Sequence, residues 1–470
     1  MLDFSKSFRT VANGFTQAKG WFFILFGYFT LHYVLRVALS DTLQIDAAEQ
    51  VVQSQDLRFD YGNFQPPLFT WLLHTLWLFV EPSMESFVAF RYVLLLATFW
   101  LWHLVSRLLF NSPILQLISS SSWLLMYEFA WKLHQGSTHT TLMLLALMLT
   151  LHAVLLLQNK KSKGLYIYLG FAVALGISSK YSFSGFILLA LVAGLLIADF
   201  RKIILHPYLA ITIFVATLLS VPALTPLFLD KETLESGLQN QMGYSDLGVL
   251  KGNLLSVGRV ITSAIEFMLP LILFMVFVSK NNWKALKNEA AGMWLLYVVA
   301  GYFLCFLWVS FFIDLSQLKS RWLHPFLFLM PFLLIKLIDL EGKKHRVTSY
   351  FFAVAMFSVV VLSGRFLQLT VVDTEKPNRL VIPIVNAIQN LKMPDELGEE
   401  YVYTEDIFLA AHLRVIKKVK VIVKPEGEQG AYFFTGNVID RSIINEKDEE
   451  LNSAIGFNDT VAYKVSWVKL

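Results

Sequence analysis

The chain has 470 residues, of which 56% are hydrophobic and only 16% are charged, and its formal net charge is +4. This composition excludes a soluble globular protein and an intrinsically disordered one. No basic patch points to a nucleic-acid partner, and the single cysteine, Cys305, excludes an internal disulfide.

Apolar runs of membrane-spanning length recur along most of the chain. A helix needs about 20 apolar residues to cross the hydrocarbon core of a bilayer. The sequence predicts eleven such spans, at 20–39, 86–109, 113–132, 138–157, 165–179, 182–199, 203–224, 256–279, 291–313, 323–339 and 348–366. No small-residue cleavage site follows the first run, so we expect a retained anchor. Segment 66–80 is apolar but short, and we expect it at the interface or tucked back toward the membrane.

Basic residues are distributed unevenly among the loops. The positive-inside rule assigns loops that are rich in lysine and arginine to the cytoplasm. The alternate loops predicted to be cytoplasmic carry Lys6, Arg9, Lys19, Arg107, Lys160, Lys161, Lys163, Arg201, Lys202, Lys280, Lys284, Lys287, Lys343, Lys344 and Arg346. This topology places loops 40–85 and 225–255, together with the C-terminus, on the outer face of the membrane.

The composition changes near Val371, because the following residues are mixed and charged. Helix-like runs occur at 378–391 and 405–417, and strand-like runs occur at 401–403 and 419–423. They predict a small α/β domain outside the membrane. The predicted fold class is an all-α polytopic membrane protein over residues 1–370, with a C-terminal extramembrane α/β domain over 371–470.

An acidic loop follows the first predicted span. Asp46 and Glu49 are three residues apart, so both would face the same side of a helix. A carboxylate at the membrane boundary is costly to dehydrate and is a candidate for function. Such a carboxylate can remove a proton from an attacking hydroxyl or amine. The alternative is that Asp46 is a solvated loop acid or a helix N-cap. The spacing alone favours this non-catalytic interpretation.

Two cations at the ends of apolar spans are candidates for binding a phosphate. Lys180 follows two serines and has almost no polar sequence around it, so it must reach an anion or extend to the lipid headgroups. Arg321 can bind a phosphate bidentately. An interfacial anchor formed with Trp322 is the alternative for Arg321.

Residues 131–141 form a polar cluster that contains two histidines but no evident third ligand for a metal. His139 is expected to form hydrogen bonds within the helix bundle. Arg91, at the start of a span, requires an acid or a phosphate as partner, with Glu85 and Glu128 as candidate acids. All of these candidates fall on the predicted outer face, which indicates one shared site.

Motifs within these loops resemble the polytopic GT-C glycosyltransferases of the family 39 type. That family includes bacterial aminoarabinose transferases and protein O-mannosyltransferases. The matching motifs, in order, are Asp46-Ala47-Ala48-Glu49-Gln50, Tyr61-Gly62, Gln65-Pro66-Pro67-Leu68, Trp71, Phe90-Arg91-Tyr92, Thr138-His139-Thr140, Ser179-Lys180-Tyr181 and Arg321-Trp322 with Pro325. The resemblance covers roughly residues 20–366. The glutamate that follows the aspartate in the family is Ala47 here, and Glu49 is the candidate replacement.

The resemblance implies transfer of a sugar from a polyprenyl-phosphate-linked donor to a lipid, glycan or protein acceptor, with inversion at the sugar carbon. Asp46 would act as the base, with Glu49 as the second catalytic candidate. The implied phosphate-binding residues are Lys180, Arg321 and Arg91, and the implied substrate-binding residues are Tyr61, Gln65, His139 and Tyr181. No cofactor is expected. The resemblance leaves room for a divalent metal, but the sequence offers no clear ligands.

The implied location is the bacterial inner membrane, with a periplasmic C-terminal domain. The main competing hypothesis is a transporter or lipid flippase. Against it, the sequence contains no internal repeat, and its ionisable residues gather at one membrane face. A sugar-polymer ligase, or a sensor whose outer domain binds a ligand, are further alternatives.

Overall fold

The structure is a computed structural model. It describes residues 18–62, 65–225, 227, 249–278, 286–287, 289–310, 320–338, 344–371, 380, 382–394, 401–424, 432–440, 453–457 and 461–469. The predicted outer loop 225–255 therefore lies largely outside the described residues, as do Lys6, Arg9, Lys280, Lys284 and Lys343.

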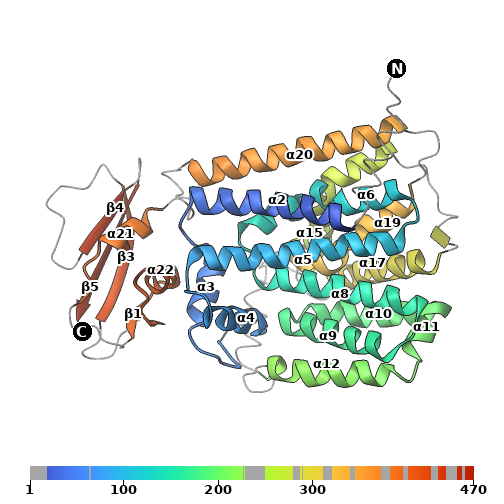
Figure 1. Ribbon diagram of the computed structural model, residues 1–470, viewed down its shortest axis with the longest axis horizontal. Helices are drawn as coiled ribbons and strands as arrows, with labels where there is room; N and C mark the ends of the chain where they lie inside the picture. The colour runs from blue at the N-terminus through green and yellow to red at the C-terminus, as the bar shows by residue number, and fades with distance from the viewer. Residues whose placement is uncertain are drawn as a thin grey trace.

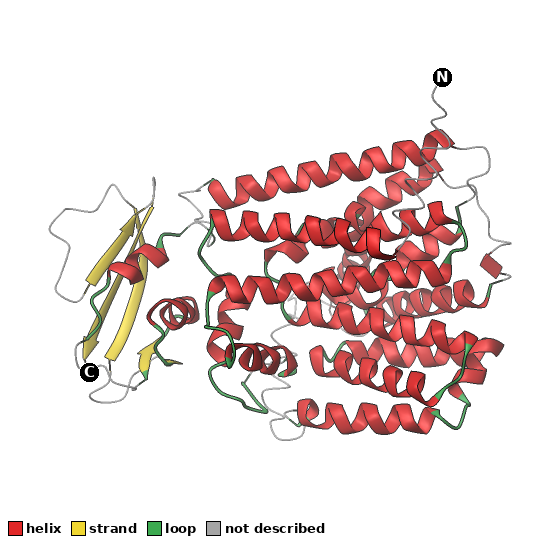
Figure 2. Cartoon of the chain, viewed as in Figure 1, coloured by secondary structure: helices red, strands yellow, loops and turns green. Residues whose placement is uncertain are grey.

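Among the described residues, helices make up the first part of the chain, and the strands lie in its C-terminal part (Figure 2). In chain order the helices are α2 (Ala18–Leu39), α3 (Ile45–Gln53), α4 (Leu68–Trp77), α5 (Met84–Leu109), α6 (Pro113–Ser121), η1 (Ser122–Leu125), α7 (Tyr127–Ala130), η2 (Lys132–Gln135), α8 (His139–Asn159), α9 (Lys163–Ser179), α10 (Phe183–Leu196), α11 (Ala198–Ile204), α12 (Leu209–Leu224), α15 (Val249–Val278), α17 (Ala290–Val309), η3 (Ser320–Leu323), α18 (His324–Leu327), α19 (Met330–Lys336) and α20 (Lys344–Thr370).

Six helices in the described part of the chain are long and apolar enough to cross a membrane: α2, α5, α8, α15, α17 and α20. The pair α11 and α12, bent by 62°, forms a seventh candidate, while α9, α10 and the α18–α19 run are shorter apolar helices. The prediction of many membrane helices is therefore supported, but the count of eleven is not confirmed. Helix α4 has only 10 residues and is too short to span, as expected for segment 66–80.

The prediction of one continuous span at 113–132 is wrong, because the chain breaks there into α6, η1 and α7. The break falls in a run of serines. Ser120 donates to the carbonyl of Gln116 at 2.7 Å, and Ser121 donates to that of Leu117 at 2.8 Å. Serine hydroxyls that bond back to the preceding turn compete with the helical backbone pattern and bend helices.

The C-terminal unit is a five-stranded sheet with two helices, in the strand order β2-β1-β3-β5-β4. Its elements are α21 (Ile384–Asn390), β1 (Val402–Thr404), α22 (Ile407–Lys417), β2 (Val421–Val423), β3 (Tyr432–Asp440), β4 (Ser453–Phe457) and β5 (Val461–Lys469). Strand β1 pairs in parallel with β2 and β3, whereas β5 pairs antiparallel with β3 and β4. The expected mixture of helices and strands is present, and β3 to β5 were not predicted.

Helix α22 joins this unit to the helix bundle. Its residues Phe408, Leu409 and Leu413 belong to the core of the C-terminal unit. One turn apart on another side of the helix, Ala411 and Val415 are buried in the large core of the bundle. The two cores therefore meet at α22, beside α3 (Figure 1).

The two ends of the bundle differ in the elements they carry. Helices α3 and α4 and the C-terminal unit lie at one end, and α11, with Arg201 and Lys202, lies at the other (Figure 1). This separation agrees with the predicted topology, in which α3 is outside and Arg201 is cytoplasmic.

The topology predicts different chemical accessibility at the two ends. In a Cys305→Ser background, which removes the exposed native thiol, a membrane-impermeant thiol reagent should label Leu57→Cys in cells with a permeabilised outer membrane. The same reagent should leave Lys160→Cys unlabelled until the inner membrane is opened. Labelling of both positions, or the reverse order, would contradict the predicted orientation.

Candidate functional site

Helix α3 has two chemically distinct sides. Ala47, Ala48 and Val51 are buried, whereas Asp46 is exposed and Glu49 is partly exposed. Spacing of three and four residues puts each set on its own helix face, so the apolar face packs inward while the acids face away. Asp46 lies in the first turn of α3, where the helix N-terminus favours a negative charge.

Both acids line a cavity of about 450 Å³ at this end of the bundle. Its lining residues come from segments far apart in the sequence: Gln44, Asp46, Glu49, Gln65, Glu128, Lys132, Gln135, Gly136, Ser137, Thr138, His139, Thr140, Lys180, Trp322 and His324. The cavity thus brings together five of the residues predicted for the site, namely Asp46, Glu49, Gln65, His139 and Lys180.

Lys180 supplies a positive charge to this cavity. It directly follows α9, and its ammonium group donates to the hydroxyl of Thr140 at 3.1 Å. Thr140 is in the first turn of α8 and lines the same cavity. A cation and a carboxylate on one water-accessible cavity can bind a phosphate and activate a nucleophile, respectively.

Sequence reasoning missed a charged cluster on the cavity wall. The buried Glu128 carboxylate contacts the Lys132 ammonium at 2.8 Å and the His324 Nε2 at 3.3 Å. From the sequence, Glu128 is predicted only as a candidate partner of Arg91. Its spacing of four residues from Lys132 was the available signal, because acid and base at i and i+4 meet on one helical side. This pair was missed because the sequence analysis assigns residues 113–132 to one continuous membrane span.

Comparison with known proteins places the fold. Residues 64–225 match the family model described as dolichyl-phosphate-mannose-protein mannosyltransferase. The crystal structure of ArnT from Cupriavidus metallidurans bound to undecaprenyl phosphate superposes with a TM-score of 0.63, at 11% identity, covering 95% of this chain and 98% of ArnT. The resemblance to the GT-C superfamily is confirmed.

Two curated relatives of this chain are the lipopolysaccharide core galacturonosyltransferases RgtB and RgtA of Rhizobium johnstonii. They are 27% and 26% identical over 329 residues, which are 68% of this chain and 66% and 64% of the relatives. The match therefore spans just under two thirds of their length. Relatives and family model are all named as glycosyltransferases, in agreement with the predicted enzyme class.

Three buried arginines shape the backbone around the cavity: Arg36, Arg91 and Arg365. Each donates to backbone carbonyls of segments 40–42 or 133–137, and a buried guanidinium needs such partners. Their bonds are Arg36 to Ser40 at 2.5 Å and to Thr42, Arg91 to Leu133 at 2.8 Å and Ser137 at 3.0 Å, and Arg365 to His134 at 3.2 Å. Arg91 thus contacts carbonyls where an acid or phosphate was expected, and it is not among the residues that line the cavity.

Two further predicted site residues, Tyr61 and Tyr181, have other surroundings. The Tyr61 hydroxyl donates to the carbonyl of Asp56 at 2.8 Å, and the Tyr181 hydroxyl donates to that of Ala223 at 3.2 Å. Neither tyrosine is among the lining residues of the cavity. Arg321 lies on η3, but its side chain is outside the described residues; the adjacent Trp322 lines the cavity.

No group of three or more His, Cys, Asp or Glu residues within the described ranges could hold a metal ion. His134 and His139 of the 131–141 cluster do not form such a group there. Metal independence stays a prediction.

Gly136 is required where the cavity wall meets the start of α3. Its φ is +142°, and an added Cβ would lie 2.1 Å from Oε1 and 3.3 Å from Cβ of Gln44, the residue that precedes α3. We expect Gly136→Ala to displace Gln44, to destabilise the protein by about 1–3 kcal/mol and to reduce transfer. Thermal unfolding and a transfer assay measure these effects.

Gly62→Ala is the matched control, because Gly62 also has a positive φ, +69°, but an added Cβ there meets nothing within 4 Å. Gly62→Ala should show the loss of stability caused by backbone strain, without displacement of a neighbouring side chain. Equal effects of the two variants would mean that contact with Gln44 is unimportant.

Proposed function

We propose that this chain transfers a sugar from a polyprenyl-phosphate-linked donor to an acceptor at the outer face of the bacterial inner membrane. The observation that carries the proposal is that Asp46 and Lys180, from α3 and the end of α9, line one cavity. The GT-C resemblance and the names of the relatives support it. No nucleotide-binding motif is needed, because the donor arrives attached to lipid.

The chemistry follows from these two groups. Asp46 removes the proton from the acceptor nucleophile, whose lone pair attacks the anomeric carbon of the sugar. The bond between that carbon and the phosphate oxygen breaks on the opposite side, so the configuration inverts. The bonding electrons remain on the departing lipid phosphate, where the Lys180 ammonium stabilises the charge. Arg321 is proposed to assist Lys180.

The relatives bear on the substrates. RgtA and RgtB are named for transfer of galacturonic acid to the lipopolysaccharide core, and the ArnT structure contains undecaprenyl phosphate. We therefore propose a lipid-phosphate-linked sugar as donor, a sugar acid as the first candidate, and a lipopolysaccharide component as the first acceptor to test. The C-terminal unit is proposed to be periplasmic.

The test compares envelope lipids from cells with and without this chain by mass spectrometry. We expect one sugar-bearing species to disappear when the chain is removed and to return with the unaltered gene. Membranes containing the chain should transfer the same sugar from lipid extract, but not from the corresponding nucleotide sugar. Transport of a lipid-linked sugar without any new glycosidic bond would instead favour a flippase.

A further inference from the structure

The position of Asp46 depends on how the start of α3 is held. Gln44 precedes the helix and provides no side-chain hydrogen bond to cap it. The backbone just before the helix is held from outside instead. The N–H of the buried Leu43 donates to Nε2 of His412 at 2.9 Å, and His412 lies on α22 of the C-terminal unit. Leu43 is only three residues from Asp46.

His412 is set up to accept this hydrogen bond. Its Nδ1–H donates to the carbonyl of Phe408 at 2.6 Å, which leaves Nε2 with its lone pair. The side chain is fully buried, and burial lowers the pKa of His412 to about 4. The imidazole is therefore neutral at physiological pH, and Nε2 faces the Leu43 N–H as an acceptor.

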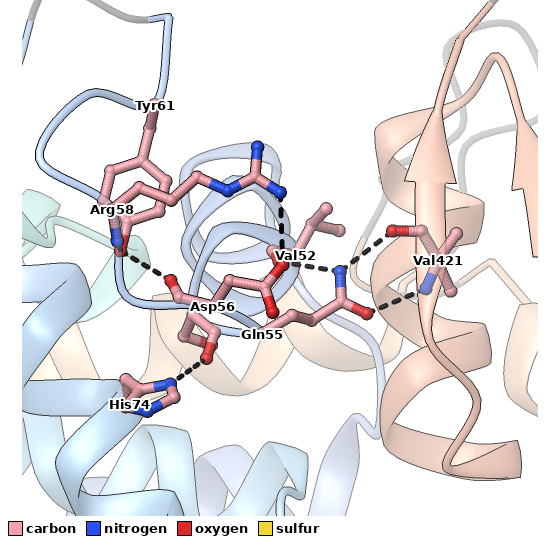
Figure 3. Close-up of polar contacts among 8 residues, drawn as sticks. Val52, Gln55, Asp56, Arg58, Tyr61, His74 and Val421 are labelled. Carbon is pink, nitrogen blue, oxygen red and sulfur yellow. Dashed lines mark hydrogen bonds and ion pairs between the residues drawn. The ribbon is translucent and has the colours of Figure 1, made fainter. Parts of the chain in front are cut away.

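The C-terminal unit also holds the other end of α3. The Gln55 side chain, two residues beyond the helix, bonds the backbone of Val421 in β2 (Figure 3). Its Nε2 donates to the Val421 carbonyl at 2.9 Å, and its Oε1 accepts from the Val421 N–H at 2.8 Å. The carbonyl of Ser54, the residue that follows α3, contacts Nδ1 of His74 in α4 at 2.8 Å.

The buried face of α3 is the third point of contact with the C-terminal unit. Ala47, Ala48 and Val51 share one hydrophobic cluster with Ala411 and Val415 of α22. Asp46 and Glu49 are on the other side of α3 and face the cavity. A shift of α22 would therefore move the acids relative to Lys180, which is carried by a different helix.

We propose that His412 is a positioning residue, through which the C-terminal unit sets the start of α3 and thereby the place of Asp46 in the cavity. This inference rests on the proposed role of Asp46. His412 does not touch the substrates; it acts through the Leu43 N–H. The C-terminal unit is thus part of the catalytic architecture at the outer face.

The test uses the full-length protein with His412→Leu, which removes the acceptor, and His412→Gln, whose side-chain oxygen can replace Nε2. The envelope-lipid product is measured by mass spectrometry per molecule of folded protein, and binding of undecaprenyl phosphate is measured on the purified variants. Because misplacement by about 1 Å costs up to about 100-fold in rate, we expect His412→Leu to reduce product formation by about 10- to 100-fold. His412→Gln should restore most of it.

Binding of undecaprenyl phosphate should stay unchanged in both variants, because His412 bonds Leu43 and Phe408, whereas Lys180 bonds Thr140. Lys417→Ala is the control on the same helix, since its ammonium donates to the Gln389 and Leu391 carbonyls within the C-terminal unit. It should leave product formation unchanged. If His412→Leu fails to fold, Gln55→Leu provides the same comparison, because the half-buried Gln55 lies just beyond the far end of α3. The expected fall in product formation is smaller.

Several results would overturn the proposal. Normal product formation by His412→Leu, with Asp46→Asn inactive, would remove the positioning role and leave the proposed function intact. A fall matched by an equal loss of undecaprenyl phosphate binding, without rescue by His412→Gln, would assign His412 to stability alone. Full activity of Asp46→Asn would instead reject the role of Asp46 on which this inference rests, and absence of the product from the unaltered protein would reject the proposed function itself.

Discussion

Asp46→Asn should reduce sugar transfer by about 100- to 10,000-fold, which is the usual contribution of a positioned general base. The amide has nearly the shape of the carboxylate but cannot accept the proton of the acceptor. Asp46 is exposed to the cavity, so the substitution leaves no buried charge without a partner. The protein should therefore fold and insert normally, and only turnover should fall.

The measurement is product formation in membranes that contain equal amounts of each variant. Glu49→Gln is the matched comparison, because Glu49 lines the same cavity one helical turn away and accepts a hydrogen bond from Gln53 at 3.3 Å. It should cause the smaller fall. Full turnover by Asp46→Asn would eliminate this residue as the base, and a greater loss in Glu49→Gln would transfer the role to Glu49.

Lys180→Ala should lower kcat/KM for the lipid-linked donor by about 100-fold, comparable to the loss of one group that stabilises charge in a transition state. The departing phosphate gains negative charge as its bond to the sugar breaks, and the ammonium group opposes that charge in the cavity. The KM for the acceptor should change little. Initial rates measured while each substrate is varied separately distinguish the two effects.

Lys202→Ala is the control for the loss of a lysine from this membrane protein. Its ammonium is exposed and pairs with Asp199 at 3.2 Å on α11, at the opposite end of the bundle. An exposed pair of this kind contributes little to stability, so transfer should be unchanged. Equal losses for donor and acceptor in Lys180→Ala would argue against a role at the phosphate.

Part of the cavity lining was predictable because its signals are local. The spacing of Asp46 and Glu49 gave their common face, and the isolation of Lys180 among apolar residues indicated that it needs an anion. The shared cavity of these residues depends on helix packing, which no local pattern specifies. Arg91 illustrates the limit of prediction from sequence. The sequence indicates that this cation needs a partner, but it cannot identify the partners as backbone carbonyls, because every residue has one.

The missed strands have a similar explanation. Gly436 lies inside β3, and an added Cβ there would be 2.3 Å from the hydroxyl of Tyr463 in β5. A glycine usually weakens a strand prediction, but within a sheet it also marks close approach by a neighbour. That neighbour is distant in sequence, so the reason for the glycine becomes visible only when the two strands pair.

The apolar side of α22 has a practical consequence for fragments of this protein. Ala411 and Val415 are buried against the membrane bundle, not within the sheet. A fragment cut near residue 371 would present them to water as part of a bare hydrophobic face and would tend to self-associate. Crystallisation or antibody selection should therefore use the intact chain in detergent or nanodiscs, where this face is covered.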